Sequence, residues 1–147
     1  MKKTIFIFLV GLLVLPFFVY AAPSAGIKPS SFFYFIDMGF ERLNLILTFN
    51  AEKKAQKALE YAEEHLAEAK EEAESNKPQE VEKAIKNYEI NIVLATEKSK
   101  ELENESKTEA LLNTVSSNTQ QHQEVLKSVY EKVPEEAKEA VLRAIEV

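Results

Sequence analysis

The stretch AEKKAQKALEYAEEHLAEAKEEAES, residues 51–75, consists almost entirely of residues that favour an α-helix. Its apolar positions recur at alternating spacings of four and three residues, the period of a helix that packs against other helices. These positions are Ala55, Leu59, Ala62, Leu66, Ala69 and Ala73. The stretch therefore predicts a long helix with a narrow, alanine-rich inner face.

The same spacing recurs in two later segments. One seam consists of Val81, Ile85, Tyr88, Ile92, Ala95, Ser99 and Leu102, and the other of Leu111, Val115, Asn118, His122, Val125 and Val129. Pro78 and Pro134 stand near helix starts, where the missing N–H costs nothing. Asn50 can cap the helix that follows it, because its side-chain oxygen can accept from a free backbone amide.

These signals predict an all-α fold, and the sequence carries no strand signal. We expect helices at 51–75, 78–103, 107–132 and 135–146, and a shorter one within 33–49. Residues 22–31 are expected to form an extended leader. The expected architecture of residues 32–147 is a single domain, an antiparallel helical bundle of three long helices plus short N- and C-terminal helices.

Residues 1–21 have the three-part form of a secretory signal peptide. A lysine pair precedes an apolar run from Ile5 to Val19, small residues follow, and we expect cleavage between Ala21 and Ala22. The alternative is an uncleaved anchor, because a spanning helix needs ~17–25 apolar residues and this run is at or just below that length. We therefore expect an exported protein, extracellular or periplasmic, that is membrane-anchored if the segment is retained.

The composition excludes several classes of protein. The sequence contains no cysteine, so disulfides, thiolate metal sites and lipid attachment to cysteine are excluded. The formal net charge is −6, and it becomes −8 if residues 1–21 with their two lysines are removed. An acidic chain of this kind has no electrostatic footprint for nucleic acid and is repelled by anionic lipid headgroups.

The segment from Phe32 to Phe49 is unusually apolar for an otherwise charged chain: twelve of its eighteen residues are apolar. One interpretation is a core helix whose inner face is Ile36, Phe40, Leu43 and Leu47, supplying the area that the alanine seam lacks. The other is an exposed interaction patch made of Phe32, Phe33, Phe35, Phe40 and Phe49. Its partner would be another envelope protein or a second copy. Membrane contact is expected only through this segment or an uncleaved anchor.

Three segments together resemble a known family. They are GIKPSSFFYFIDMGFERLNLILTFNAEKKAQKALEYAEEHLAEAKE (26–71), NKPQEVEKAIKNYE (76–89) and HQEVLKSVYEKVPEEAKEAVLRAIE (122–146). Their order and spacing resemble domain of unknown function 5667, whose pattern has a Pro-x-Ser and aromatic lead, a Thr-Phe, a Lys-Pro helix start and a closing Val-Pro-Glu-Glu-Ala. Asn50-Ala51 departs from it, because an Asp-Pro helix start would fit better. The resemblance implies an exported helical domain of bacteria or archaea, and implies no activity.

The two histidines are His65 and His122. His122 lies one turn after Asn118 in a stretch without charge, ALLNTVSSNTQQHQ, so we expect a buried polar seam at these two positions. The interpretation we favour is a hydrogen-bonded histidine packed against Ala and Tyr, or a polar pair that fixes helix register. The alternative is a metal site in which His122 is joined by His65 or by a carboxylate such as Glu64 or Glu68.

Nothing in the sequence indicates an enzyme or a cofactor. The glutamates of EEHLAEAKEEAE are expected on a solvated face, without the shelter that a catalytic pair needs. Asn104 begins an Asn-Glu-Ser sequon at an expected turn, which is a candidate glycosylation site. We therefore expect a non-enzymatic domain at the cell envelope that acts through protein contacts. The alternatives are a metal- or ligand-binding envelope-stress protein and a holdase-type chaperone.

Overall fold

The structure is a computed structural model that describes residues 25–147. Its helices are α1 (Tyr34–Leu47), α2 (Ala51–Glu74), α3 (Pro78–Lys100), α4 (Glu105–Lys132) and α5 (Glu135–Glu146). Within these residues the chain forms no strand, so the predicted all-α bundle is confirmed. The predicted signal peptide (1–21) and its cleavage site between Ala21 and Ala22 lie outside the described residues.

The helix ends follow from local capping. Asn50 accepts a hydrogen bond from the Lys53 amide at 2.9 Å, and Asn104 accepts one from the Lys107 amide at 3.0 Å. Because Asn104 is the cap, α4 begins at Glu105, two residues before the predicted start. Asn76 has a positive φ of 54°, a left-handed conformation that asparagine tolerates, and this residue turns the chain from α2 into α3.

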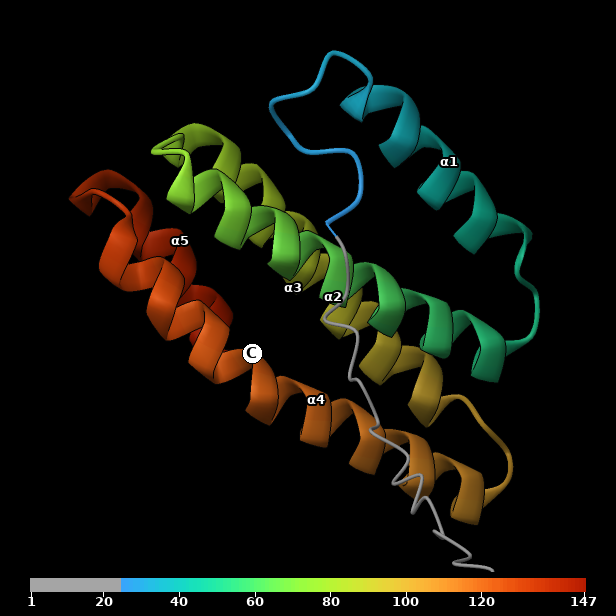
Figure 1. Ribbon diagram of the computed structural model, residues 1–147. Helices are drawn as coiled ribbons and strands as arrows, with labels where there is room; N and C mark the ends of the chain where they lie inside the picture. The colour runs from blue at the N-terminus through green and yellow to red at the C-terminus, as the bar shows by residue number, and fades with distance from the viewer. Residues whose placement is uncertain (1–24) are drawn as a thin grey trace, which may run out of the picture.

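The helices form three layers (Figure 1). α2 and α3 run antiparallel in the middle layer, and α4 and α5 pack on one side of this pair. Lys107 of α4 pairs with Glu52 of α2 at 2.8 Å, and Lys132 pairs with Glu74 at 2.9 Å. Matching ends of the two helices therefore lie together, so α4 runs parallel to α2. The third layer is α1 alone, on the opposite side of the α2–α3 pair, where its backbone approaches only α2.

The core lies among α2, α3, α4 and α5. Every position of the first predicted seam is buried, and so are the second-seam positions except the half-buried Leu102. In the third seam Leu111, Val115, His122 and Val129 are buried, whereas Asn118 and Val125 are half-buried. Leu126 instead reaches the core. The close helix approach that alanine permits brings α2 and α3 together along most of their length.

α5 supplies the apolar area that the thin α2 seam lacks. Four of its residues, Ala137, Ala140, Val141 and Ala144, are buried in the same core cluster as Ile85 and Tyr88 of α3. The sequence interpretation that assigned this role to 32–49 is therefore wrong. From α1, only the half-buried Leu45 packs against the core.

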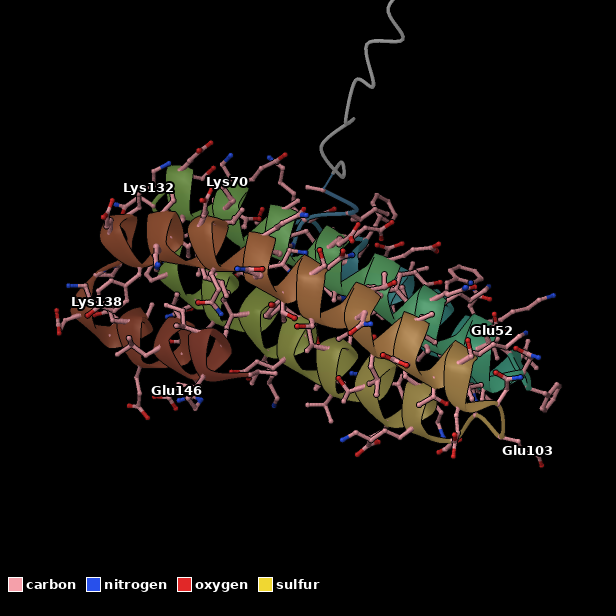
Figure 2. The ribbon with its side chains drawn as sticks, turned by 90° about the horizontal axis from the view of Figure 1, so that it is seen from below. Glu52, Lys70, Glu103, Lys132, Lys138 and Glu146 are labelled. Atoms are coloured by element: carbon pink, nitrogen blue, oxygen red, sulfur yellow. The ribbon has the colours of Figure 1, made fainter. Side chains whose placement is uncertain are left out.

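Charged side chains project outward around the bundle (Figure 2). Lys70 and Lys132 lie toward one end of the molecule and Glu52 and Glu103 toward the other. Across residues 25–147, no helix combines the length and apolar character that crossing a bilayer requires.

Candidate functional site

The face of α1 that packs against the bundle contains both polar and apolar side chains. Tyr34, Met38, Glu41 and Leu45 repeat at helical spacing on this face, and Glu41 is the only α1 residue that is buried. The Asn87 side-chain amide of α3 donates to the Tyr34 hydroxyl at 2.6 Å. Polar contacts therefore hold much of this helix in place.

A second set of polar contacts lies toward the end of α1. The Asn44 side-chain amide donates to the Tyr61 hydroxyl at 2.7 Å, and Lys57 Nζ donates to the side-chain oxygen Oδ1 of Asn44 at 2.6 Å. Tyr61 and Lys57 both belong to α2. Together with the Tyr34 contact, these bonds fix the rotation of α1 about its own axis.

The opposite face of α1, together with the residues that flank the helix, is apolar and exposed. We call this surface the aromatic face; it consists of Phe32, Phe33, Phe35, Ile36, Phe40, Leu43, Ile46, Leu47 and Phe49. Its phenylalanines are exposed by 81% (Phe32), 58% (Phe33), 71% (Phe35), 67% (Phe40) and 88% (Phe49). Phe32 and Phe33 also stack edge to face, with ring centroids 5.4 Å apart. All residues proposed from sequence as an interaction patch are therefore exposed.

The sequence prediction for the inner face of this segment is wrong. It placed Ile36, Phe40, Leu43 and Leu47 toward the core. All four side chains are exposed, by 40–67%. The physical reason is the surface that α1 meets, because α2 and α3 present His65, Glu68 and Asn87 there. These polar groups need hydrogen-bond partners that an apolar face cannot supply.

Beneath α1 lies a buried histidine held by two carboxylates. His65 Nδ1 is 2.9 Å from Glu68 Oε2, and His65 Nε2 is 3.1 Å from Glu41 Oε2. The His65 and Glu68 side chains are fully buried, and Glu41 is nearly so. Burial alone lowers the pKa of His65, but the hydrogen bonds and charges of Glu41 and Glu68 outweigh it and raise the pKa to about 9. His65 is therefore a protonated bridge between α1 and α2 at neutral pH.

Two glutamates of α2 are buried, contrary to the sequence prediction. Glu68 and Glu72 were expected on a solvated face, yet both are fully buried. Glu72 Oε1 accepts from the Ser30 amide at 3.1 Å, and its Oε2 lies 3.5 Å from Lys77 Nζ. Burial would raise the pKa of Glu72, but these partners outweigh it and lower the pKa. Glu72 thus anchors the leader segment to α2.

The second histidine occupies a separate environment. The Tyr88 hydroxyl of α3 lies 3.3 Å from His122 Nδ1, and the two rings pack edge to face with centroids 5.6 Å apart. Burial lowers the pKa of His122 to about 4, so the ring is neutral at pH 7. This arrangement agrees with the interpretation of a hydrogen-bonded histidine packed against tyrosine. Asn118, the other member of the predicted polar seam, is half-buried and donates to Glu63 at 2.5 Å.

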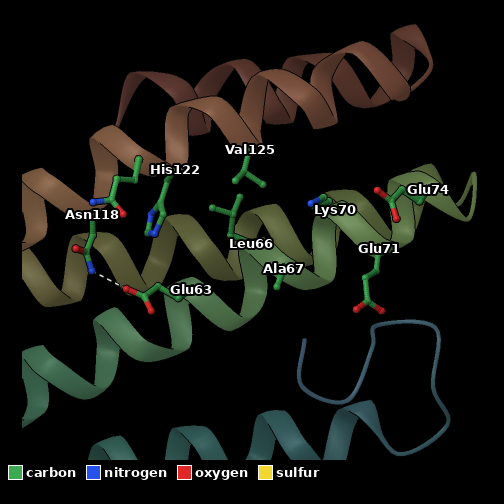
Figure 3. A pocket seen from close by; sticks show the side chains of 10 residues that line it. Glu63, Leu66, Ala67, Lys70, Glu71, Glu74, Asn118, His122 and Val125 are labelled. Atoms are coloured by element: carbon green, nitrogen blue, oxygen red, sulfur yellow. Dashed lines mark hydrogen bonds between the residues drawn. The ribbon is translucent and has the colours of Figure 1, made fainter. Parts of the chain in front are cut away.

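His122 lines a groove of about 510 Å³ between α2 and α4 (Figure 3). Leu66 and Val125 face each other across it, and the Asn118–Glu63 hydrogen bond closes one end. Lys70 and Glu74 lie toward the other end. The groove therefore has an apolar middle and polar ends, and a hydrogen bond within the protein closes one of these ends.

The two histidines do not converge on a metal site. Carboxylates bind both ring nitrogens of His65, whereas His122 faces Tyr88. Over the described residues 25–147, no group of three or more His, Cys, Asp or Glu side chains is placed to hold a metal ion. Glu64 lies near His65 and the acidic groups around it rather than near His122. Asn104 is exposed and caps α4, so the sequon is on the surface.

The fold and the site define an all-α bundle domain with an outlying helix, which is pinned by a buried His–carboxylate cluster and exposes an aromatic face. The chain belongs to the family described as a domain of unknown function (DUF5667), which matches residues 26–136. The matched region begins in the leader, covers α1 to α4 and ends at the start of α5. The comparisons with curated proteins and with solved structures gave no match.

Proposed function

We propose that this protein is a non-enzymatic helical domain of the cell envelope that acts through protein–protein contacts, with the aromatic face of α1 as its contact surface. One observation carries the proposal: the only buried residue of α1 is a glutamate, while its phenylalanines, its isoleucines and its leucines other than the half-buried Leu45 face solvent. Contiguous apolar patches on monomers mark interaction sites when they exceed a few hundred Å². The envelope location rests on the signal-like sequence of residues 1–21.

The way α1 is attached supports the proposal. His65, Asn87 and Tyr61 all contact polar groups of α1, so rotating the helix to hide its apolar side would leave these groups without partners. The aromatic face is thus displayed outward by a defined set of bonds. A surface that is fixed before binding loses less conformational entropy when a partner arrives.

The chemistry of the two histidines supports a non-enzymatic role. Both nitrogens of His65 are already bound by carboxylates, which leaves neither free to accept a proton from a substrate. Burial keeps the pKa of His122 at about 4, far below the range of a general base working at neutral pH. Neither ring therefore has the features of a catalytic base.

The test is site-specific photocrosslinking in cells of the source organism. Benzoylphenylalanine replaces Phe35 or Phe40 on the aromatic face and, as a matched control, Val93 of α3, which is exposed by 45%. We expect discrete protein adducts from positions 35 and 40 and none from position 93. The identified partner should bind the purified wild-type protein, and Phe35→Ser with Phe40→Ser should abolish that binding. Absence of discrete adducts from positions 35 and 40 would overturn the proposal.

A holdase-type chaperone is the second candidate, because the same aromatic face could bind unfolded clients without selecting one. Such a protein would suppress aggregation of a reduced or heated client at near-equal molarity, and Phe35→Ser with Phe40→Ser would remove the effect. Adducts spread over many proteins in the crosslinking experiment would favour this candidate. No suppression at a several-fold excess would reject it.

A further inference from the structure

A hollow of about 380 Å³ lies between α1 and α2, at the edge of the aromatic face. Carboxylates of Asp37, Glu41 and Glu64 line one part of it. The side chains of Phe40, Leu43 and Leu47 line another part and also belong to the aromatic face. Asn44 and Tyr61 complete the lining. The hollow therefore brings acidic side chains next to apolar side chains that continue onto the exposed surface of α1.

The acidic groups extend beneath the leader segment. A Cβ atom placed on Gly26 would lie 3.2 Å from Glu68 Oε1, 3.6 Å from Asp37 Oδ2 and 3.7 Å from Glu64 Oε2. Oxygens of three carboxyl groups thus lie close to the Gly26 backbone, and the neighbouring Ile27 amide donates to Asp37 Oδ2 at 3.4 Å. Glu68 is fully buried, and among the described residues its Oε1 has no hydrogen-bond partner. Glu68 pairs with His65 through its other oxygen and does not line the hollow, whereas Asp37 and Glu64 lie both near Gly26 and in the hollow.

The basic groups nearby compensate only part of this cluster. Protonated His65 pairs with Glu41 and Glu68, whereas Lys28 pairs with Glu71 and Lys57 donates to Asn44. Within residues 25–147, neither Asp37 nor Glu64 forms an ion pair with a lysine or arginine. The desolvated setting raises the pKa of both Glu64 and Glu68, which is the effect of burial without sufficient positive charge.

The shape of the hollow favours an organic cation over a bare metal ion. The described carboxyl groups are not placed to coordinate a metal. An ammonium or guanidinium group can instead donate hydrogen bonds to several carboxylates while its alkyl stem lies on Phe40, Leu43 and Leu47. Those three side chains lead directly onto the aromatic face, so a ligand with further apolar groups could cover both surfaces.

We propose that this hollow receives a lysine or arginine side chain of the partner, so that the segment docking on the aromatic face is a basic amphipathic helix. This inference rests on the proposed function. Charge complementarity selects this occupant, since the surface combines an apolar strip with adjacent, uncompensated carboxylates. A bilayer rich in anionic lipid is disfavoured as the occupant, because the chain carries a net charge of −6.

The test uses two designed amphipathic peptides of alanine and leucine that differ at one central position, lysine in one and norleucine in the other. Fluorescence anisotropy measures their binding to the purified protein. We expect the lysine peptide to bind roughly tenfold tighter, the low end of what close charge pairs across interfaces contribute. Asp37→Asn with Glu64→Gln should remove this preference. The matched control, Glu82→Gln with Glu97→Gln on exposed positions of α3, should retain it.

The Phe40→Ser variant distinguishes a failure of the proposed cation site from a failure of the aromatic face as a contact surface. If both peptides bind equally and Phe40→Ser weakens both, the cation site is overturned while the aromatic face stands as a contact surface. If neither peptide shows binding that depends on Phe40, the contact surface is overturned together with the cation site. Retention of the lysine preference in the Asp37/Glu64 variant would also overturn the cation site.

Discussion

Glu41 Oε2 of α1 lies 3.1 Å from His65 Nε2 of α2, and the His65 side chain is fully buried. Glu68 binds the other ring nitrogen at 2.9 Å. α1 is therefore joined to the bundle through a buried charge contact rather than through its many apolar side chains. This contact explains why the aromatic face can point away from the core.

The two histidines should titrate at widely separated pH values. Because the chain contains only His65 and His122, their imidazole signals can be assigned in a pH titration followed by NMR. We expect a pKa of about 9 for His65, where carboxylate contacts outweigh burial, and of about 4 for His122, where burial acts alone. Glu41→Gln should lower the pKa of His65 and leave His122 unchanged. Two titrations near the ordinary value of ~6.5 would contradict both environments.

The stability of the fold should depend on pH through His65. Its folded-state pKa lies above the unfolded value, so the stabilisation is complete below about pH 6.5 and is lost as the pH rises through 9. Chemical unfolding of the wild type should therefore show a fall in the free energy of unfolding, on the order of a few kcal/mol, across that interval. His65→Gln should show a much smaller fall. Parallel curves for the two proteins would refute the charged bridge.

Neighbouring positions of α4 should differ sharply in their contribution to the core. Leu126 is fully buried, whereas Val125 is half-buried at the groove beside His122. Leu126→Ala should cost about 2–5 kcal/mol, because it leaves a cavity, and Val125→Ala should cost about 1 kcal/mol or less. Urea unfolding monitored by circular dichroism at 222 nm measures both. A larger loss for Val125→Ala would mean that the helix faces the core in a different rotation.

The bundle should fold without α1. Residues 50–147 contain the whole buried core cluster, and from α1 only Leu45 packs against it. Thermal unfolding of residues 50–147 and residues 22–147, followed at 222 nm, should give cooperative transitions for both, with only a modest loss in the shorter chain. Glu68 would still pair with His65 in that chain. Failure of residues 50–147 to fold would show that the aromatic segment belongs to the core after all.

The sequence was sufficient to predict the long helices and most positions of their inner seams. Alternating apolar spacing identifies a helix face directly, and Asn50 and Pro78 mark helix starts through local hydrogen bonding and backbone geometry. The rotation of α1 could not be predicted in the same way. The predicted and the observed inner face of α1 have the same residue spacing. The predicted face is Ile36, Phe40, Leu43 and Leu47, and the observed face is Tyr34, Met38, Glu41 and Leu45. The polar surface of α2 and α3 decides between them.

The buried carboxylates were missed for a related reason. Glu68 and Glu72 occur in a repetitive run where their neighbours Glu71 and Glu74 reach solvent, so residue type alone does not separate them. A positional signal did exist. His65, Glu68 and Glu72 follow one another at helical spacing, a line of ionisable groups along one side of α2. Such a line containing histidine can indicate that another element covers it.

The most direct test of the contact surface exploits the absence of native cysteine. Phe40→Cys on the aromatic face and Val93→Cys on α3 are each treated with a maleimide, first as purified proteins and then in intact cells of the source organism. We predict that both react readily when purified, since both side chains are exposed. In cells, position 40 should be protected and position 93 should react as before. Equal reactivity of position 40 in both settings would contradict a partner on the aromatic face.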